Sequence, residues 1–171
     1  MVIIRAEQPA DIPAIARVNE LAFGRKNEGK LVDLIRHSEH FIPELSLVAE
    51  ENGEIAGHIL FSSAMIEREG SVQPMITLAP MAVVPGQQGK GIGSQLVREG
   101  LRVCRELGHP LVVVLGHSTF YPKFGFVISK EKGIHPPFPV PDDVFMVCEL
   151  EEGAAARFQG TVQYPPAFGA V

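Results

Sequence analysis

The sequence has 171 residues, about the size of one ordinary domain, of which 46% are hydrophobic and 20% are charged. Its formal net charge is −5, with 15 Lys and Arg against 20 Asp and Glu, so a basic surface for nucleic acid is not expected. No apolar run approaches the roughly 20 residues that a membrane helix needs, and the N-terminal residues lack the pattern of a signal peptide. We expect a cytoplasmic protein with a single domain, residues 1–171, that binds neither nucleic acid nor membrane.

The N-terminal part of the chain predicts one strand and two helices. The segment "VIIR", residues 2–5, has the composition of a short strand, and apolar residues recur at helical spacing in "PADIPAIARVNELAF". A second helix is predicted in "NEGKLVDLIRHS", where Leu31, Leu34 and Ile35 share a face. The chain then changes period: two apolar runs are separated by Glu51-Asn52-Gly53-Glu54, and the Asn-Gly pair predicts an antiparallel hairpin.

The middle of the chain predicts two strands joined by a helix. "MITLAPMAVVP" has the pattern of a long strand, and Pro80 within it cannot donate to a sheet ladder, which indicates a bulge or an edge. "GIGSQLVREGLRVCRELG" is amphipathic and predicts a helix. Its buried face is predicted to hold Ile92, Leu96, Val97, Val103, Cys104 and Leu107. "PLVVVLG" follows as a buried strand, so residues 75–115 predict a parallel crossover in a sheet that begins antiparallel.

The last third of the chain predicts irregular structure around one clear strand. "HSTFYPKFGFV" predicts a short helix and a turn, "IHPPFPVPDD" a loop, and "VFMVCELE" a strand. Cys104 and Cys148 are too few for a disulfide framework and are interpreted as buried structural thiols. His37 and His40 lack the companions of a zinc site, so no metal is expected.

The segment "PGQQGKGIGSQLV", residues 85–97, has the pattern of an anion-binding loop. Glycines between a strand and a helix allow unusual torsions and the close approach of a phosphate. The first N–H groups of the helix are unpaired and carry the positive end of the helix dipole. A phosphate or pyrophosphate is therefore the expected guest of this loop.

Two common phosphate motifs do not fit the glycine spacing. A nucleotide P-loop needs four residues before Gly-Lys-Ser/Thr, whereas only two separate Gly86 from Gly89, and Gly91 follows Lys90 where the magnesium-binding hydroxyl should stand. The dinucleotide fingerprint would place its third glycine at Ser94, and no acidic residue ends the following strand.

The pattern that fits is Q-x-x-G-x-G, from Gln88 to Gly93, and here the chain resembles the GNAT superfamily of N-acetyltransferases. "LAPMAVVPGQQGKGIGSQLV" is similar to the whole central motif of that family, and "VLGHSTFYPKFGF" to the next one. The tail "GTVQYPPAF" resembles the ending of a bacterial subgroup of small predicted acetyltransferases. The resemblance implies a mixed α/β (α+β) fold: a mostly antiparallel sheet that is splayed at the cofactor site and flanked by helices.

The resemblance also implies which residues bind acetyl-CoA, the co-substrate of the family. Strand-end backbone groups of Met81, Ala82 and Val83 would pair with the pantetheine arm. The loop would hold the pyrophosphate through Gln88, Gly89, Lys90, Gly91, Ile92, Gly93 and Ser94. Lys90 is equally well interpreted as a solvated loop lysine.

The chemistry of acetyl transfer requires a free amine, a stabilised oxyanion and a proton for the departing thiolate. The resemblance places Tyr121 as the catalytic proton donor. The family's acidic residue on the central strand is missing from "TLAPMAVV", so the general base stays open between Glu20, Glu28, His58 and water, with His117 beside the expected thiol. No cysteine lies in the loop, which favours direct transfer in a ternary complex.

The acceptor is expected to be an amine of a small molecule or peptide. Residues that could line an apolar pocket or attract a cation are Phe23, Phe138, Phe145, Glu20, Glu28, Asp142 and Asp143. The apolar tail could cover a partner's surface, which leaves a homodimer open. The alternative function is a non-catalytic acyl-CoA-binding or sensor module of the same fold with a degenerate acceptor cleft.

Overall fold

The structure is a computed structural model that describes all residues from 1 to 171. Nine strands join one sheet. The strands are β1 (Val2–Ala6), β2 (Phe41–Glu51), β3 (Glu54–Arg68), β4 (Ser71–Val83), β5 (Leu111–Leu115), β6 (Val127–Ile128), β7 (Ile134–His135), β8 (Phe145–Glu149) and β9 (Gly160–Gln163). The α-helices are α1 (Ile12–Phe23), α2 (Asn27–Arg36) and α3 (Ile92–Glu106). None of these helices is long and apolar enough to cross a membrane.

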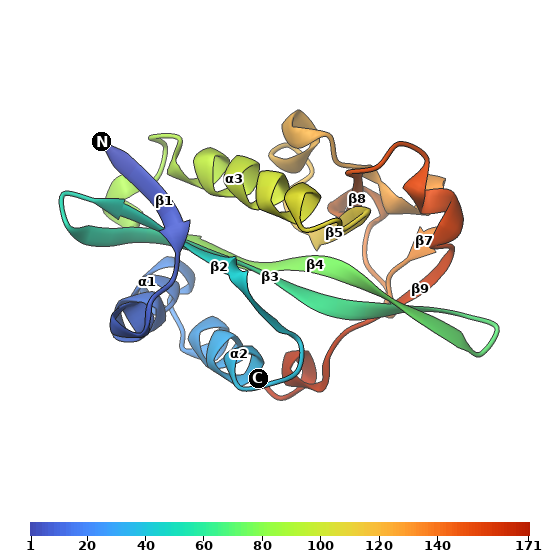
Figure 1. Ribbon diagram of the computed structural model, residues 1–171, viewed down its shortest axis with the longest axis horizontal. Helices are drawn as coiled ribbons and strands as arrows, with labels where there is room; N and C mark the ends of the chain where they lie inside the picture. Colours follow the sequence, from blue (N-terminus) through green and yellow to red (C-terminus); the bar gives the residue numbers. More distant parts are fainter.

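The sheet is mixed and mostly antiparallel, as expected. Its main strand order is β1-β2-β3-β4-β5-β8-β6, and the β4–β5 pair is the parallel one in that row. β9 pairs antiparallel with β3 and parallel with β7. Figure 1 shows α3 on one face of the sheet and α1 and α2 on the other, with the C-terminus beside α2. The sheet is therefore covered on both faces.

The predicted hairpin between β2 and β3 is confirmed. Glu51 and Glu54 are paired, and Asn52 and Gly53 have φ angles of 53° and 79°. Such left-handed torsions in both turn residues suit the twist of two antiparallel strands. A second hairpin, which the sequence analysis did not identify, turns at Glu69-Gly70 and starts β4 at Ser71, earlier than the apolar run indicated.

The helices pack on the sheet largely through the predicted residues, with two corrections. Leu34 is 43% exposed, and Val32 is buried against the sheet together with Leu31 and Ile35. On α3, Leu107 is exposed because it lies past the last turn, and Leu101 is buried instead. Cys104 and Cys148 are buried and free, as predicted, and burial raises the pKa of the Cys104 thiol to about 12.

His58 lies inside a polar chain between β3 and the α1–α2 face. Its Nε2 atom lies 3.0 Å from Ser46 Oγ, and its Nδ1 atom lies 3.3 Å from Asn19 Nδ2. Ser46 donates to Glu7, whose carboxylate also accepts from Arg36 at 2.8 Å. These partners fix a neutral imidazole with its proton on Nε2. Burial, with a smaller contribution from the Arg36 charge, lowers the pKa of His58 from 6.5 to about 3.

The buried imidazole predicts a pH-dependent stability. Between about pH 6.5 and pH 3 the unfolded chain binds a proton at His58 and the folded chain does not, so stability should fall as pH falls, by up to about 1.4 kcal/mol per pH unit. Urea unfolding from pH 7.0 down to pH 5.5 measures this slope. His58→Gln should flatten it, whereas His37→Gln, a change in a solvent-exposed histidine, should leave it unchanged. Equal slopes in all three proteins would contradict the prediction.

Candidate active site

The sheet opens where β4 and β5 part. The two strands are paired only from Ile76 to Leu78, and the last residue of β5 that pairs with β4 is Val114. At the same point the β3–β4 register shifts, so Ala79 and Pro80 lie opposite the single residue Leu60. This bulge confirms the interpretation of Pro80 and turns the end of β4 away from β5.

The end of β4 presents free backbone groups to this opening. The Val84 N–H donates to the Ala56 carbonyl at 2.9 Å. Because hydrogen-bonding direction alternates along an antiparallel strand, the backbone groups of Ala82 point to β3, and those of Met81 and Val83 point to the unpaired side. The Val83 carbonyl on that side accepts from Gln88 Nε2 at 3.0 Å. The Val83 N–H and both backbone groups of Met81 remain available.

A cavity of about 1020 Å³ lies where β4 and β5 part. It is lined by the β4 end, the glycine loop and the start of α3, and also by α1, α2 and the C-terminal tail. Since α3 and the α1–α2 pair lie on opposite faces (Figure 1), the cavity passes through the sheet. Every predicted cofactor residue lines it except Lys90, whose Nζ instead bonds to Gln87 Oε1 at 3.2 Å. Lys90 therefore fits the interpretation as a solvated loop lysine.

The glycine loop presents the start of α3 to the cavity. Gly89 and Gly91 have φ angles of 79° and 84°, and Gly91 is the residue before the helix. No side chain caps α3, and outside helices and strands no backbone hydrogen bond is donated by residues 88–94. Unpaired N–H groups at the positive end of a 15-residue helix can hold a phosphate.

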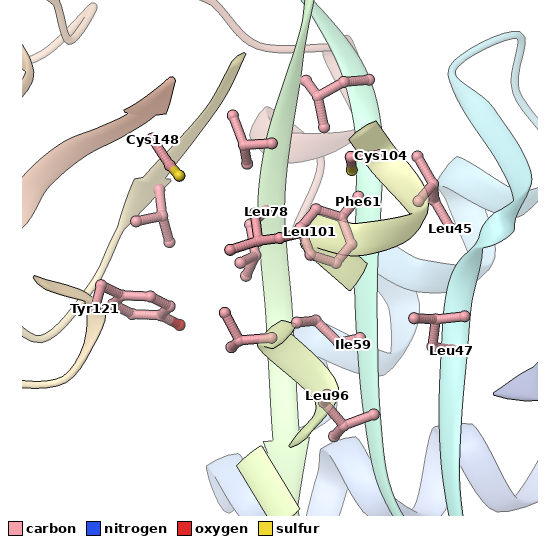
Figure 2. Packing of buried hydrophobic residues seen from close by; sticks show 14 of the residues in the cluster. Leu45, Leu47, Ile59, Phe61, Leu78, Leu96, Leu101, Cys104, Tyr121 and Cys148 are labelled. Atoms are coloured by element: carbon pink, nitrogen blue, oxygen red, sulfur yellow. The ribbon is translucent and has the colours of Figure 1, made fainter. Parts of the chain in front are cut away.

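Tyr121 lies in the wall of the cavity after β5. Its ring rests on Gly116, where an added Cβ would come within 2.4 Å of the ring, and meets the edges of Phe120 and Phe126 at centroid distances of 5.0 and 5.5 Å. Figure 2 shows the hydroxyl directed toward β4. Burial raises the pKa of Tyr121 to about 12. The phenol is thus held in place and stays protonated at neutral pH.

The structure separates the candidate bases. Glu28 and His117 line the cavity, whereas Glu20 and His58 do not. The carboxylate of Glu28 accepts hydrogen bonds from Nε and Nη2 of Arg25. This interaction lowers the pKa of Glu28. His58 is buried and hydrogen bonded in the polar chain described above. It therefore fits the other interpretation, that of a core histidine.

The far end of the cavity combines predicted and unpredicted residues. Phe23 and Phe138 line it, but Phe145 is buried in the core and Asp142 pairs with Lys130 outside. Asp143 also lies outside the cavity. Two residues of the tail, Tyr164 and Phe168, also line the cavity and were not expected from the sequence. The tail packs on α2 of its own chain through Ala167 and Phe168. The two aromatic residues in the tail segment "VQYPPAF" were the sequence signal that could have indicated this role.

Known proteins resemble the chain over most of its length. A family model described as an acetyltransferase (GNAT) domain matches residues 3–129. The uncharacterized N-acetyltransferase YjhQ of Escherichia coli K12 is 40% identical over 135 residues, which are 78% of this chain and 75% of YjhQ. The uncharacterized N-acetyltransferase YhbS of the same strain is 32% identical over 163 residues, 95% of each chain.

Two solved structures are similar in fold and sequence. The GNAT family N-acetyltransferase YhbS from Escherichia coli in complex with CoA has a TM-score of 0.90 and 31% identity, covering 98% of this chain and 92% of that one. A GNAT family acetyltransferase from Brucella melitensis in complex with acetyl-CoA has a TM-score of 0.79 and 34% identity, covering 98% of both chains.

Proposed function

The chain belongs to the GNAT acetyltransferase family, and from that premise we propose that it transfers the acetyl group of acetyl-CoA to an amine of a small molecule or peptide. Membership makes it an acetyl-CoA-dependent N-acetyltransferase. The proposal adds direct attack in a ternary complex, with residues 1–171 as one catalytic domain. The observation that carries it is the cavity that passes through the parting of β4 and β5.

Acetyl-CoA fits the residues of this cavity. The free N–H groups at the start of α3 would hold the pyrophosphate. The open edge of Met81 and Val83 would pair with the amides of the pantetheine arm, and Ala82 would contribute to the wall without backbone contacts. Tyr121 and the bulge residues Ala79 and Pro80 line the same cavity, so the phenol could supply a proton to the sulfur of the thioester there.

In the proposed transfer, the amine attacks from the α1–α2 face. The amine nitrogen bonds to the carbonyl carbon, the carbon–sulfur bond breaks, and the thiolate takes the phenolic proton of Tyr121. Burial raises the pKa of the Tyr121 phenol to about 12, so the phenol still carries its proton when the thiolate leaves. We assign removal of the amine proton to water at the cavity mouth, because Arg25 makes Glu28 a weaker base. No cysteine lines the cavity, which supports direct attack.

The decisive test is calorimetric titration with acetyl-CoA, with NADH and ATP as controls. Selective binding of acetyl-CoA is expected, followed by release of free thiol when an amine is added. Equal binding of all three ligands, or none, would overturn the proposal. The alternative of a non-catalytic sensor required a degenerate acceptor cleft, whereas the cavity extends to residues of α1, α2 and the C-terminal tail at that end.

A further inference from the structure

Aromatic rings form the wall of the cavity on the α1–α2 face. Phe138 and Tyr164 are stacked, with ring centroids 6.1 Å apart and planes 22° apart, and Tyr164 and Phe168 follow at 4.9 Å and 43°. Phe23 of α1 also lines this end and, like Phe138, keeps about two fifths of its surface exposed. We call these four residues the aromatic wall. Three separate segments of the chain supply it, so it exists only in the folded protein.

The negative charge at this end of the cavity is paired with a neighbouring positive charge. Glu28 is the one carboxylate among the lining residues. Both of its oxygens accept from Arg25, and the pKa of Glu28 is lowered accordingly. The lining cation, Lys123, lies over the rings of Phe120 and Phe124, at 4.4 and 5.4 Å from their centroids, on the Tyr121 loop. A ligand at the aromatic wall therefore meets apolar surface and a paired carboxylate.

We infer that the acceptor is a primary amine joined to a flat apolar body without a carboxylate, the class of arylalkylamines. This inference rests on the proposed function. The rings of the wall offer faces and edges to a planar group. A carboxylate on the acceptor would be desolvated beside Glu28, and a second ammonium would find no unpaired negative charge to replace its water.

The wild-type protein tests this inference with three amines in a thiol-release assay. Phenethylamine is the probe, phenylalanine adds a carboxylate to it, and 1,5-diaminopentane replaces its ring by a second cation. The value of kcat/KM should be about 10- to 100-fold higher for phenethylamine than for either comparison amine. If either comparison amine is used as well or better, the inference is overturned. If acetyl-CoA itself fails to bind in the calorimetric titration, the proposed function has failed as well.

Variants of Phe138 test the wall directly, because this side chain is 40% exposed and its replacement should leave the fold intact. Phe138→Leu removes the ring and should raise the KM for phenethylamine about 3- to 10-fold, with kcat and acetyl-CoA affinity unchanged. Phe138→Tyr keeps the ring and should keep the KM. Val72→Ala, an exposed apolar change outside the cavity, is the control. An unchanged KM in Phe138→Leu would overturn the assignment of the wall.

Discussion

Replacing Tyr121 by phenylalanine is expected to lower kcat by about 10²- to 10⁴-fold, the usual contribution of a positioned proton donor. The ring should stay where it is, because Gly116, Phe120 and Phe126 contact its carbons and not its hydroxyl. Only the proton for the thiolate is lost. Stopped assays with saturating amine and acetyl-CoA measure kcat, and calorimetry should give an unchanged acetyl-CoA affinity.

The matched control for this variant is Tyr164→Phe, since the chain has two tyrosines. Tyr164 lies at the acceptor end, and phenylalanine keeps its ring there, so the replacement should leave kcat at saturating amine near the parent value. If Tyr121→Phe also keeps the parent kcat, then water and not the phenol protonates the thiolate. If its acetyl-CoA affinity falls in parallel with kcat, Tyr121 is a binding residue.

Replacing Gly91 by valine is expected to weaken acetyl-CoA binding by about 10²- to 10⁴-fold. Gly91 has a φ of 84°, and a β-branched residue is strained there, although no neighbouring atom would meet its Cβ. The loop should shift and turn the first N–H groups of α3 away from the pyrophosphate. Losing two charge-assisted hydrogen bonds of about 1.5–3 kcal/mol each accounts for the range.

The same change at Gly86 provides the control. Gly86 lies in the same loop but has no left-handed torsion, has free space for a Cβ, and does not line the cavity. Gly86→Val should therefore bind acetyl-CoA like the parent protein, with both variants melting as cooperative folded proteins. Equal affinities for the two variants would show that the start of α3 does not hold the cofactor.

Features that depend on a few adjacent residues could be predicted from the sequence. The Asn52-Gly53 turn, the bulge at Pro80 and the glycine loop each follow from local torsional preferences, and all three lie where they were expected. The order of strand and helix between residues 75 and 115 follows from hydrophobic period in the same way. These local signals were sufficient to identify the cavity residues that we propose bind acetyl-CoA.

The acceptor half depends on contacts between distant segments and was predicted less well. Tyr164 reaches the cavity because β9 pairs with Met65–Glu67 of β3, a pairing that no local pattern encodes. Phe145 and Phe138 look alike in sequence, but Phe145 lies in β8, which is buried inside the sheet, while the loop before β8 leaves Phe138 at the cavity. The pairing of Glu28, a candidate base, is by contrast local: both of its oxygens accept from Arg25, three residues before it.

The parting of β4 and β5 has a consequence for the folding equilibrium. The end of β4 is a short unpaired sheet edge inside the molecule, and on the proposed function the pantetheine arm takes the place of the missing strand. A ligand that binds only the folded state stabilises it in proportion to the logarithm of its free concentration. The stability of the folded protein should then rise with the free concentration of any ligand that carries the pantetheine arm and the pyrophosphate, CoA as well as acetyl-CoA.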